Sequence, residues 1–186
     1  MSKRILGTVV VISLAMLALF ITKTPATSAA LQANPKIVKE VRHELVTLPY
    51  YGVFDWLEFV VQPNNTVVLR GEVVRPTTKS DAEGRVKEID NVSRVINNIE
   101  VLPLSPSDDR LRRAVYRTLY GSDSPLFRYA TQSVPSIHII IKRGRATLKG
   151  IVDNKGDANI AYIRTRGVPG LFDVKSELIV PSEVSR

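Results

Sequence analysis

The chain has 186 residues, 44% of them hydrophobic and 24% charged, which is the balance of a folded globular protein rather than of a disordered one. Its 26 basic and 18 acidic side chains give a net charge of +8. It has no cysteine, which excludes disulfides, thiol nucleophiles and thiolate metal centres, and its only two histidines, His43 and His138, argue against a multi-histidine metal centre. We therefore expect a binding or scaffolding protein that uses no metal or other cofactor.

The first thirty residues have the pattern of a secretory signal peptide. Lys3 and Arg4 form a basic start, an uncharged apolar run covers 5–21, and small residues precede a cleavage point between Ala30 and Leu31. An uncleaved membrane anchor is the alternative, because this apolar run approaches the length of a bilayer span. In both cases we expect the rest of the chain to be periplasmic. It is then expected to be free, peripheral to the inner membrane, or anchored in that membrane by its N-terminus.

The exported part of the chain is an internal repeat. Three separate blocks align at one offset of 79 residues: 67–73 with 146–152, Ala82 with Ala161, and 91–101 with 170–180. One offset that serves three blocks indicates duplication rather than chance. We divide the chain as follows: a signal peptide over 1–30, a first copy over 36–103, a link over 104–108 and a second copy over 109–181.

Each copy has the pattern of a helix, two strands, a helix and a strand. In the second copy Leu111, Val115 and Leu119 form one apolar stripe, and Asp108 and Asp109 stand where the N-cap and the first helical turn are expected. The other elements predicted in this copy are strands over 137–141 and 146–152 joined by a turn at 142–145, a helix over 157–166 and a strand over 174–180. In the first copy the pattern predicts a turn over 62–65 and a helix over 79–89. The fold class is therefore α+β.

A glycine occupies the same strand position in both copies, at Gly71 and Gly150. Glycine inside a strand marks a bulge or the close approach of another element. We expect that element to be a helix crossing the sheet.

The repeat resembles the BON domain, a family named for osmotically induced periplasmic proteins and nodulation proteins. The motif Val-x-Leu-x-Gly-x-Val at 67–73, the alanine at 82 and the run Asn-Val-x-x-Val-x-Asn-x-Ile-x-Val at 91–101 carry the resemblance, together with their counterparts in the second copy. Asn91 stands where the family has glycine and Leu171 where it has valine, and both changes are conservative for packing. The resemblance covers nearly all of 36–181.

The resemblance implies two tandem αββαβ domains, an envelope location and attachment to phospholipid membranes, in some members with a role in osmotic or envelope stress. It implies no catalysis. The aromatic insertion in the first copy is less typical of the family, so the resemblance does not locate a ligand surface there.

Positive charge is concentrated in the second copy. Residues 36–103 carry nine basic and ten acidic side chains, a net of −1, whereas 109–181 carry thirteen and six, a net of +7. A cluster of basic residues holds a protein to an anionic bilayer, although an ordinary solvated face is the alternative. The expected lipid-binding residues are Arg110, Arg113 and Arg117 on one helical face, Lys142, Arg143 and Arg145 at the turn, and Arg164 and Arg166 at the end of the second helix.

An aromatic cluster, Tyr50, Tyr51, Phe54 and Trp56, lies in the first loop of the first copy. Two interpretations are open. The side chains close the small core of that copy, or they form an exposed contact surface for a membrane or a protein.

Other patterns carry little functional weight. Gly167-Val168-Pro169-Gly170 fits a nucleic-acid-binding GxxG loop, but it joins a helix to a strand in an exported chain, so we expect no nucleic-acid partner. His138 lies in a β-branched strand and is expected to be structural. The sequence has no nucleophile motif or phosphate loop, so we expect no enzyme.

The alternative to lipid binding is a protein-interaction module of an envelope assembly or secretion complex. The last strand of a copy or its neighbour would then lie at a sheet edge and accept a partner strand. Anionic phospholipids are the first expected partner and envelope proteins the second.

Overall fold

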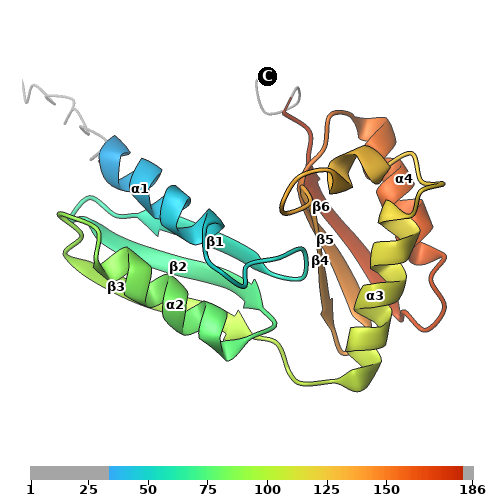
Figure 1. Ribbon diagram of the computed structural model, residues 1–186, viewed down its shortest axis with the longest axis horizontal. Helices are drawn as coiled ribbons and strands as arrows, with labels where there is room; N and C mark the ends of the chain where they lie inside the picture. Colours follow the sequence, from blue (N-terminus) through green and yellow to red (C-terminus); the bar gives the residue numbers. More distant parts are fainter. Residues whose placement is uncertain (1–33, 182–186) are drawn as a thin grey trace, which may run out of the picture. The chain divides into compact units, whose positions relative to one another are not determined.

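The computed structural model describes residues 34–181, and the expected signal peptide lies outside them. The first copy contains α1 (Pro35–Val46), β1 (Trp56–Val61), β2 (Thr66–Val73), α2 (Pro76–Lys87) and β3 (Arg94–Val101). The second contains α3 (Pro106–Tyr120), a short 3-10 helix η1 (Phe127–Ala130), β4 (Ile137–Lys142), β5 (Arg145–Ile151), α4 (Lys155–Arg166) and β6 (Asp173–Ile179) (Figure 1). The predicted α+β fold of two αββαβ units is confirmed.

Both copies build the same three-stranded sheet. The order is β1-β2-β3 in the first and β4-β5-β6 in the second, with the first pair antiparallel and the second pair parallel. The parallel pair is joined through α2 or α4, because parallel neighbours need a crossover connection. In each copy both helices cover one face of the sheet, and the other face carries no helix of that copy (Figure 1).

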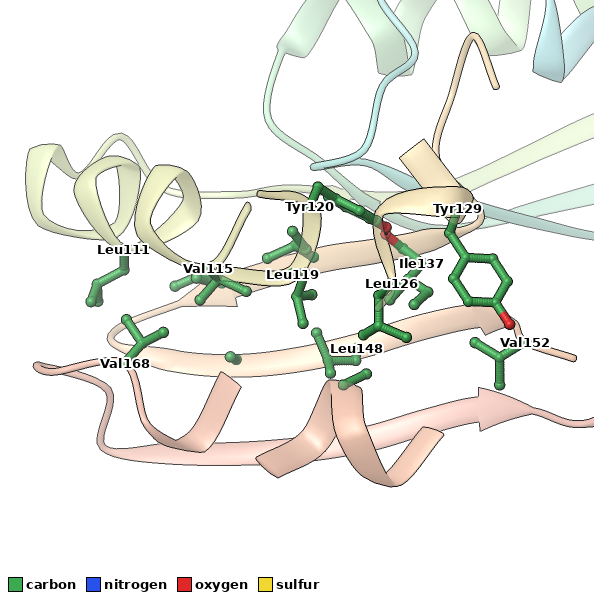
Figure 2. Packing of buried hydrophobic residues seen from close by; sticks show 14 of the residues in the cluster. Leu111, Val115, Leu119, Tyr120, Leu126, Tyr129, Ile137, Leu148, Val152 and Val168 are labelled. Atoms are coloured by element: carbon green, nitrogen blue, oxygen red, sulfur yellow. The ribbon is translucent and has the colours of Figure 1, made fainter. Parts of the chain in front are cut away.

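Each copy has its own apolar core. Along α1 the buried side chains are Ile37, Val41 and Leu45, which recur every four residues and so face the sheet together. The corresponding stripe on α3 packs above β5 in Figure 2. Burial of each such side chain contributes about 1.5–3 kcal/mol, so the stripe is what fixes each helix on its sheet.

The second copy has a longer first loop, and this loop belongs to the core. Leu126 and Tyr129 are buried beside the α3 stripe (Figure 2). The Tyr129 hydroxyl donates to the Asp157 carboxylate at 2.5 Å, and Asp157 also forms an ion pair with Arg128. The extra loop therefore enlarges a core that a unit of this size would otherwise keep small.

The helices begin earlier than the sequence pattern predicts. α3 starts at Pro106, inside the expected link, and Ser105 is its N-cap, with its hydroxyl accepting from Asp108 N at 3.1 Å. α2 starts at Pro76, three residues before the predicted Lys79. Proline suits the first helical position because its missing N–H has no intrahelical partner there, so in both cases the proline begins the helix instead of preceding it.

Asp108 is not the N-cap of α3. It is buried, and its carboxylate oxygens accept from the backbone N–H groups of Arg143 and Gly144, both at 2.9 Å. The side chain therefore ties the first turn of α3 to the β4–β5 turn, a connection that spans 35 residues of sequence.

Gly71 and Gly150 are explained by a neighbouring strand, and the expectation of a crossing helix was wrong. A Cβ at Gly71 would collide with the carbonyl oxygen of Trp56, and one at Gly150 with that of Ser136. Both glycines have φ near +120°, at 124° and 122°. The approach is thus made by the backbone of the adjacent strand, at the same register in both copies.

Candidate membrane-binding site

The outer face of α3 presents three exposed arginines. Arg110, Arg113 and Arg117 point away from the buried stripe, and within residues 34–181 none of them forms an ion pair. Arg112, by contrast, is buried, and its guanidinium donates to Asp109 at 2.5 Å and to Ile141 O at 2.7 Å. The structure therefore separates a structural arginine from three whose charge is available to a ligand.

A groove between α3 and α4 extends this basic face. Two adjoining hollows of about 490 and 500 Å³ share Ala114, Arg117 and Pro169 in their lining. Arg164 lines the first, and its guanidinium donates to Thr118 O at 3.2 Å, which holds α4 against α3. We call Arg110, Arg113, Arg117 and Arg164 the α3–α4 basic face.

The basic residues of the β4–β5 turn divide into two kinds. Lys142 forms an ion pair with Glu100 at 2.5 Å, which neutralises its charge. Arg143 and Arg145 are exposed and have no ion pair among the described residues. Asp108 holds this turn beside the start of α3, so Arg143 lies at the same end as Arg110. Arg166 is exposed at the last residue of α4 and does not line the groove.

Three of the four aromatic residues contact the second copy. Phe54 packs against the core of that copy, and its ring centroid lies 6.2 Å from that of Tyr116. The ring centroids of Tyr51 and Trp56 lie 5.5 and 5.1 Å from the ring centroid of His138. Tyr51 also packs against the core of the first copy, as one of the two interpretations expects, so the cluster both supports that core and fills the junction between the copies.

Tyr50, the fourth aromatic residue, is exposed in the first copy. The guanidinium of Arg75 lies 4.8 Å from its ring centroid. This distance is that of a cation–π contact within the first copy.

One backbone and one side-chain hydrogen bond join the same loop to the edge of β4. Ile139 N donates to Val53 O at 2.8 Å, and His138 Nδ1 donates to Asp55 O at 2.6 Å. The Asp55 carboxylate accepts from the backbone N–H groups of Gly52 and Val74, which fixes the loop on its own copy. Burial lowers the pKa of His138 and raises the pKa of Asp55.

Ion pairs across the junction account for part of the basic excess. Lys149 pairs with Glu72 of the first copy at 3.3 Å and with Glu177 at 3.6 Å. Lys142 and Glu100 form the second pair between the copies. The charge that remains available in the second copy is therefore concentrated on α3, α4 and the β4–β5 turn.

Comparison with known proteins identifies the repeat. The family described as BON domain matches residues 36–103 and 107–182. The chain belongs to the BON-domain family. It carries two such domains in tandem, as the sequence motifs predict, and we refer to the copies from here on as the first and second BON domains.

Two solved structures of CdsD are similar to the tandem BON domains. CdsD is described as a structural protein of the type III secretion system of Chlamydia trachomatis. One structure covers 81% of this chain and 96% of its own, with 13% identity and a TM-score of 0.32. The other, of the C-terminal domain, covers 80% and 99%, with 13% identity and a TM-score of 0.30. No curated protein matches the chain.

The structure adds one residue that the charge pattern did not indicate. Tyr116 on α3 is 37% exposed and lies between Arg113 and Arg117, and together with Phe54 these side chains line a shallow hollow of about 300 Å³. Tyrosine is enriched where an apolar ring meets water or lipid headgroups. Its position three residues after Arg113 places it on the arginine face, which the helical period could have shown.

The functional groups of the α3–α4 basic face are guanidinium groups. Each guanidinium on the α3–α4 basic face offers several N–H donors in the planar arrangement that matches a phosphate group. Over residues 34–181 there is no cluster of three or more side chains suited to a metal ion. In the same range, no helix is long and apolar enough to cross a membrane.

Proposed function

We propose that this chain is a non-catalytic, exported module of the bacterial envelope that attaches to anionic phospholipid membranes through its second BON domain. The α3–α4 basic face is the observation that carries the proposal. Arg110, Arg113 and Arg117 are exposed, Arg164 is half-buried, none of the four forms an ion pair within residues 34–181, and Tyr116 lies among the α3 arginines. A basic side chain near an anionic bilayer contributes about 1 kcal/mol, so four of them raise affinity by roughly a thousandfold at low salt.

The ligand class follows from the compartment and the charge. In an exported protein the abundant polyanions are phospholipids such as phosphatidylglycerol and cardiolipin, and lipopolysaccharide. The first BON domain has a net charge of −1, which makes it a poor partner for these surfaces. Its role in the proposal is to orient the second domain through the loop that contacts His138 and Ile139.

Vesicle co-sedimentation tests the proposal. Residues 31–186 are expected to bind vesicles that contain phosphatidylglycerol, to ignore neutral phosphatidylcholine vesicles, and to lose binding at high salt because exposed charges are then screened. Reversal of the α3 charges in R110E/R113E/R117E is expected to lower binding at least tenfold, since it removes three cations and adds three anions at one surface.

A second charge reversal provides the matched control. R42E/R70E/R94E changes the net charge by the same amount at three exposed arginines of the first BON domain. It is expected to keep most of the binding, and circular dichroism checks that both variants fold. Equal binding by the α3 variant and the unmodified protein would overturn the proposed face, and equal losses in both variants would reduce it to an effect of net charge.

A protein partner is the second candidate, favoured by the sheet edges. β3 and β6 both lie at the edge of their sheets, where a partner strand could add. Such binding depends on backbone hydrogen bonds and apolar contacts and is therefore far less sensitive to salt. Failure to bind any vesicle, with salt-resistant capture of an envelope protein, would favour this function.

A further inference from the structure

The two most exposed large apolar side chains of residues 34–181 both lie directly before an element of the second BON domain. Leu104 is 95% exposed and Phe172 is 82% exposed. Leu104 directly precedes Ser105, the N-cap of α3, and Phe172 directly precedes β6. Single exposed apolar residues are common on protein surfaces, so the place where these two lie decides whether they matter.

Three chain segments are tied together at this place. The Asp108 carboxylate in the first turn of α3 accepts from the N–H groups of Arg143 and Gly144, each at 2.9 Å. Phe172 N donates to Gly144 O at 2.9 Å. The Phe172 ring lies directly over Gly144, because a Cβ there would be 2.6 Å from its Cδ2. The start of α3, the β4–β5 turn and the loop before β6 therefore form one end of the domain (Figure 1).

Positive charge surrounds the apolar side chains at this end. Arg143 and Arg145 are exposed in and after the turn, and Arg110 follows Asp108 by two residues on α3. Of the nearby acids, Asp109 is paired with Arg112. Asp173 of β6 is exposed, and it is the strand partner of Arg145 in β5. We call Leu104, Arg110, Arg143, Arg145 and Phe172 the tip.

The backbone at Arg143 supports a role for its side chain. Arg143 has φ of 52°, in the left-handed region, where a residue other than glycine costs about 1 kcal/mol. Glycine or asparagine would form this turn with less strain. An arginine in this position therefore indicates that the charge serves something other than the stability of the turn.

We infer that the tip is the part of the second BON domain that enters an anionic bilayer. Phe172 and Leu104 reach the acyl region, while Arg110, Arg143 and Arg145 bind lipid phosphates above it. Apolar side chains encircled by cations match an apolar layer that lies beneath a layer of phosphates. The inference rests on the proposed function and deepens it, because it names the side chains that insert.

The absence of cysteine from the sequence allows a direct test. Phe172→Cys and Leu104→Cys, each made in residues 31–186 and labelled with the environment-sensitive dye NBD, are mixed with phosphatidylglycerol vesicles that carry a nitroxide in the acyl region. The matched control is Ile151→Cys. Ile151 is 54% exposed and ends β5, about 20 Å along the strand from Arg145.

The expected result is a blue shift and nitroxide quenching at positions 172 and 104 but not at 151. Labels at 172 and 104 that remain in water while the proteins sediment with vesicles would overturn the inference and leave the proposed function intact. Failure of the labelled and unlabelled proteins to sediment would overturn both.

A label-free variant gives a second measurement. Replacing Leu104 and Phe172 together by serine removes two exposed apolar side chains, so the fold is expected to be unaffected. Affinity for phosphatidylglycerol vesicles is expected to fall about tenfold, because the apolar contribution is lost while the charges remain. Unchanged affinity would contradict insertion of the tip.

Discussion

Backbone conformation at single residues determines how the strands of each BON domain meet. Gly71 and Gly150 have positive φ and admit the carbonyl oxygen of the neighbouring strand. Asn91 has φ of 66°, at the position where the second domain has Gly170 with φ of 91°. Asparagine tolerates the left-handed region better than other residues with a Cβ, which explains why it can replace the glycine of the family motif.

We predict that Gly150→Ala lowers the free energy of unfolding by about 2–4 kcal/mol, since its Cβ would collide with Ser136 O at a φ that alanine avoids. Gly84→Ala is the control, because Gly84 lies in α2 with open space around it and alanine favours a helix by about 1 kcal/mol. Urea unfolding measures both. Equal effects of the two substitutions would contradict the steric explanation.

The buried imidazole of His138 makes stability depend on pH. Burial holds its pKa in the folded protein below the ordinary value of 6.5. The unfolded chain therefore binds a proton first as the pH falls, and the free energy of unfolding decreases below about pH 6.5 by up to 1.4 kcal/mol per pH unit. The ionisable residues that face it are Tyr51 and Asp55 from the loop and Lys149, its strand partner in β5.

His138→Asn isolates this contribution, because an amide can donate to Asp55 O but does not titrate in this range. Urea unfolding at pH 7.5 and 5.5 is expected to show a smaller loss of stability for the variant than for the unmodified protein. Other groups titrate in both proteins and so cancel in the difference. Identical losses would mean that His138 does not carry the pH dependence.

At the scale of elements, local patterns predicted the fold and nonlocal contacts were missed. The four-residue stripes on α1 and α3 and the alternation in β6 are properties of neighbouring residues, so the sequence is enough to place these elements. Pro76 and Pro106 are start signals that the predicted boundaries did not use, so α2 begins before the predicted Lys79 and α3 begins inside the predicted link. The observed starts of these helices therefore differ from the predicted ones, whereas the prediction that these segments are helical is correct.

The candidate site was predictable only in part, for the same reason. The arginine face of α3 follows from the helical period. The neutralisation of Lys142 by Glu100 and the contact of His138 with Asp55 join residues 42 and 83 positions apart, and no local pattern encodes such pairs. The contacts of the aromatic loop with the second copy were missed on this account, because these partners lie far along the chain.

At the scale of the whole molecule, the two BON domains are expected to unfold together. Each is small, and Phe54 and Val53 of the first pack against the core of the second. Phe54→Ser is predicted to divide a single calorimetric transition of residues 31–186 into two, because it weakens the apolar contact between the domains. Tyr50→Ser is the control, since Tyr50 is exposed and its ring contacts Arg75 of the first domain. A single transition in both variants would show that the hydrogen bonds of the loop are sufficient to make the two domains unfold together.

The hydrogen bond from Ile139 N to Val53 O has a consequence for the history of the duplication. The loop of the first copy covers part of the edge of β4, the outermost strand of the second sheet on that side. A second copy without its forerunner, or a chain with the copies in reverse order, leaves that edge bare and ready to pair with another molecule. Two units that still share one sequence pattern have thus ceased to be interchangeable, and selection now acts on the pair.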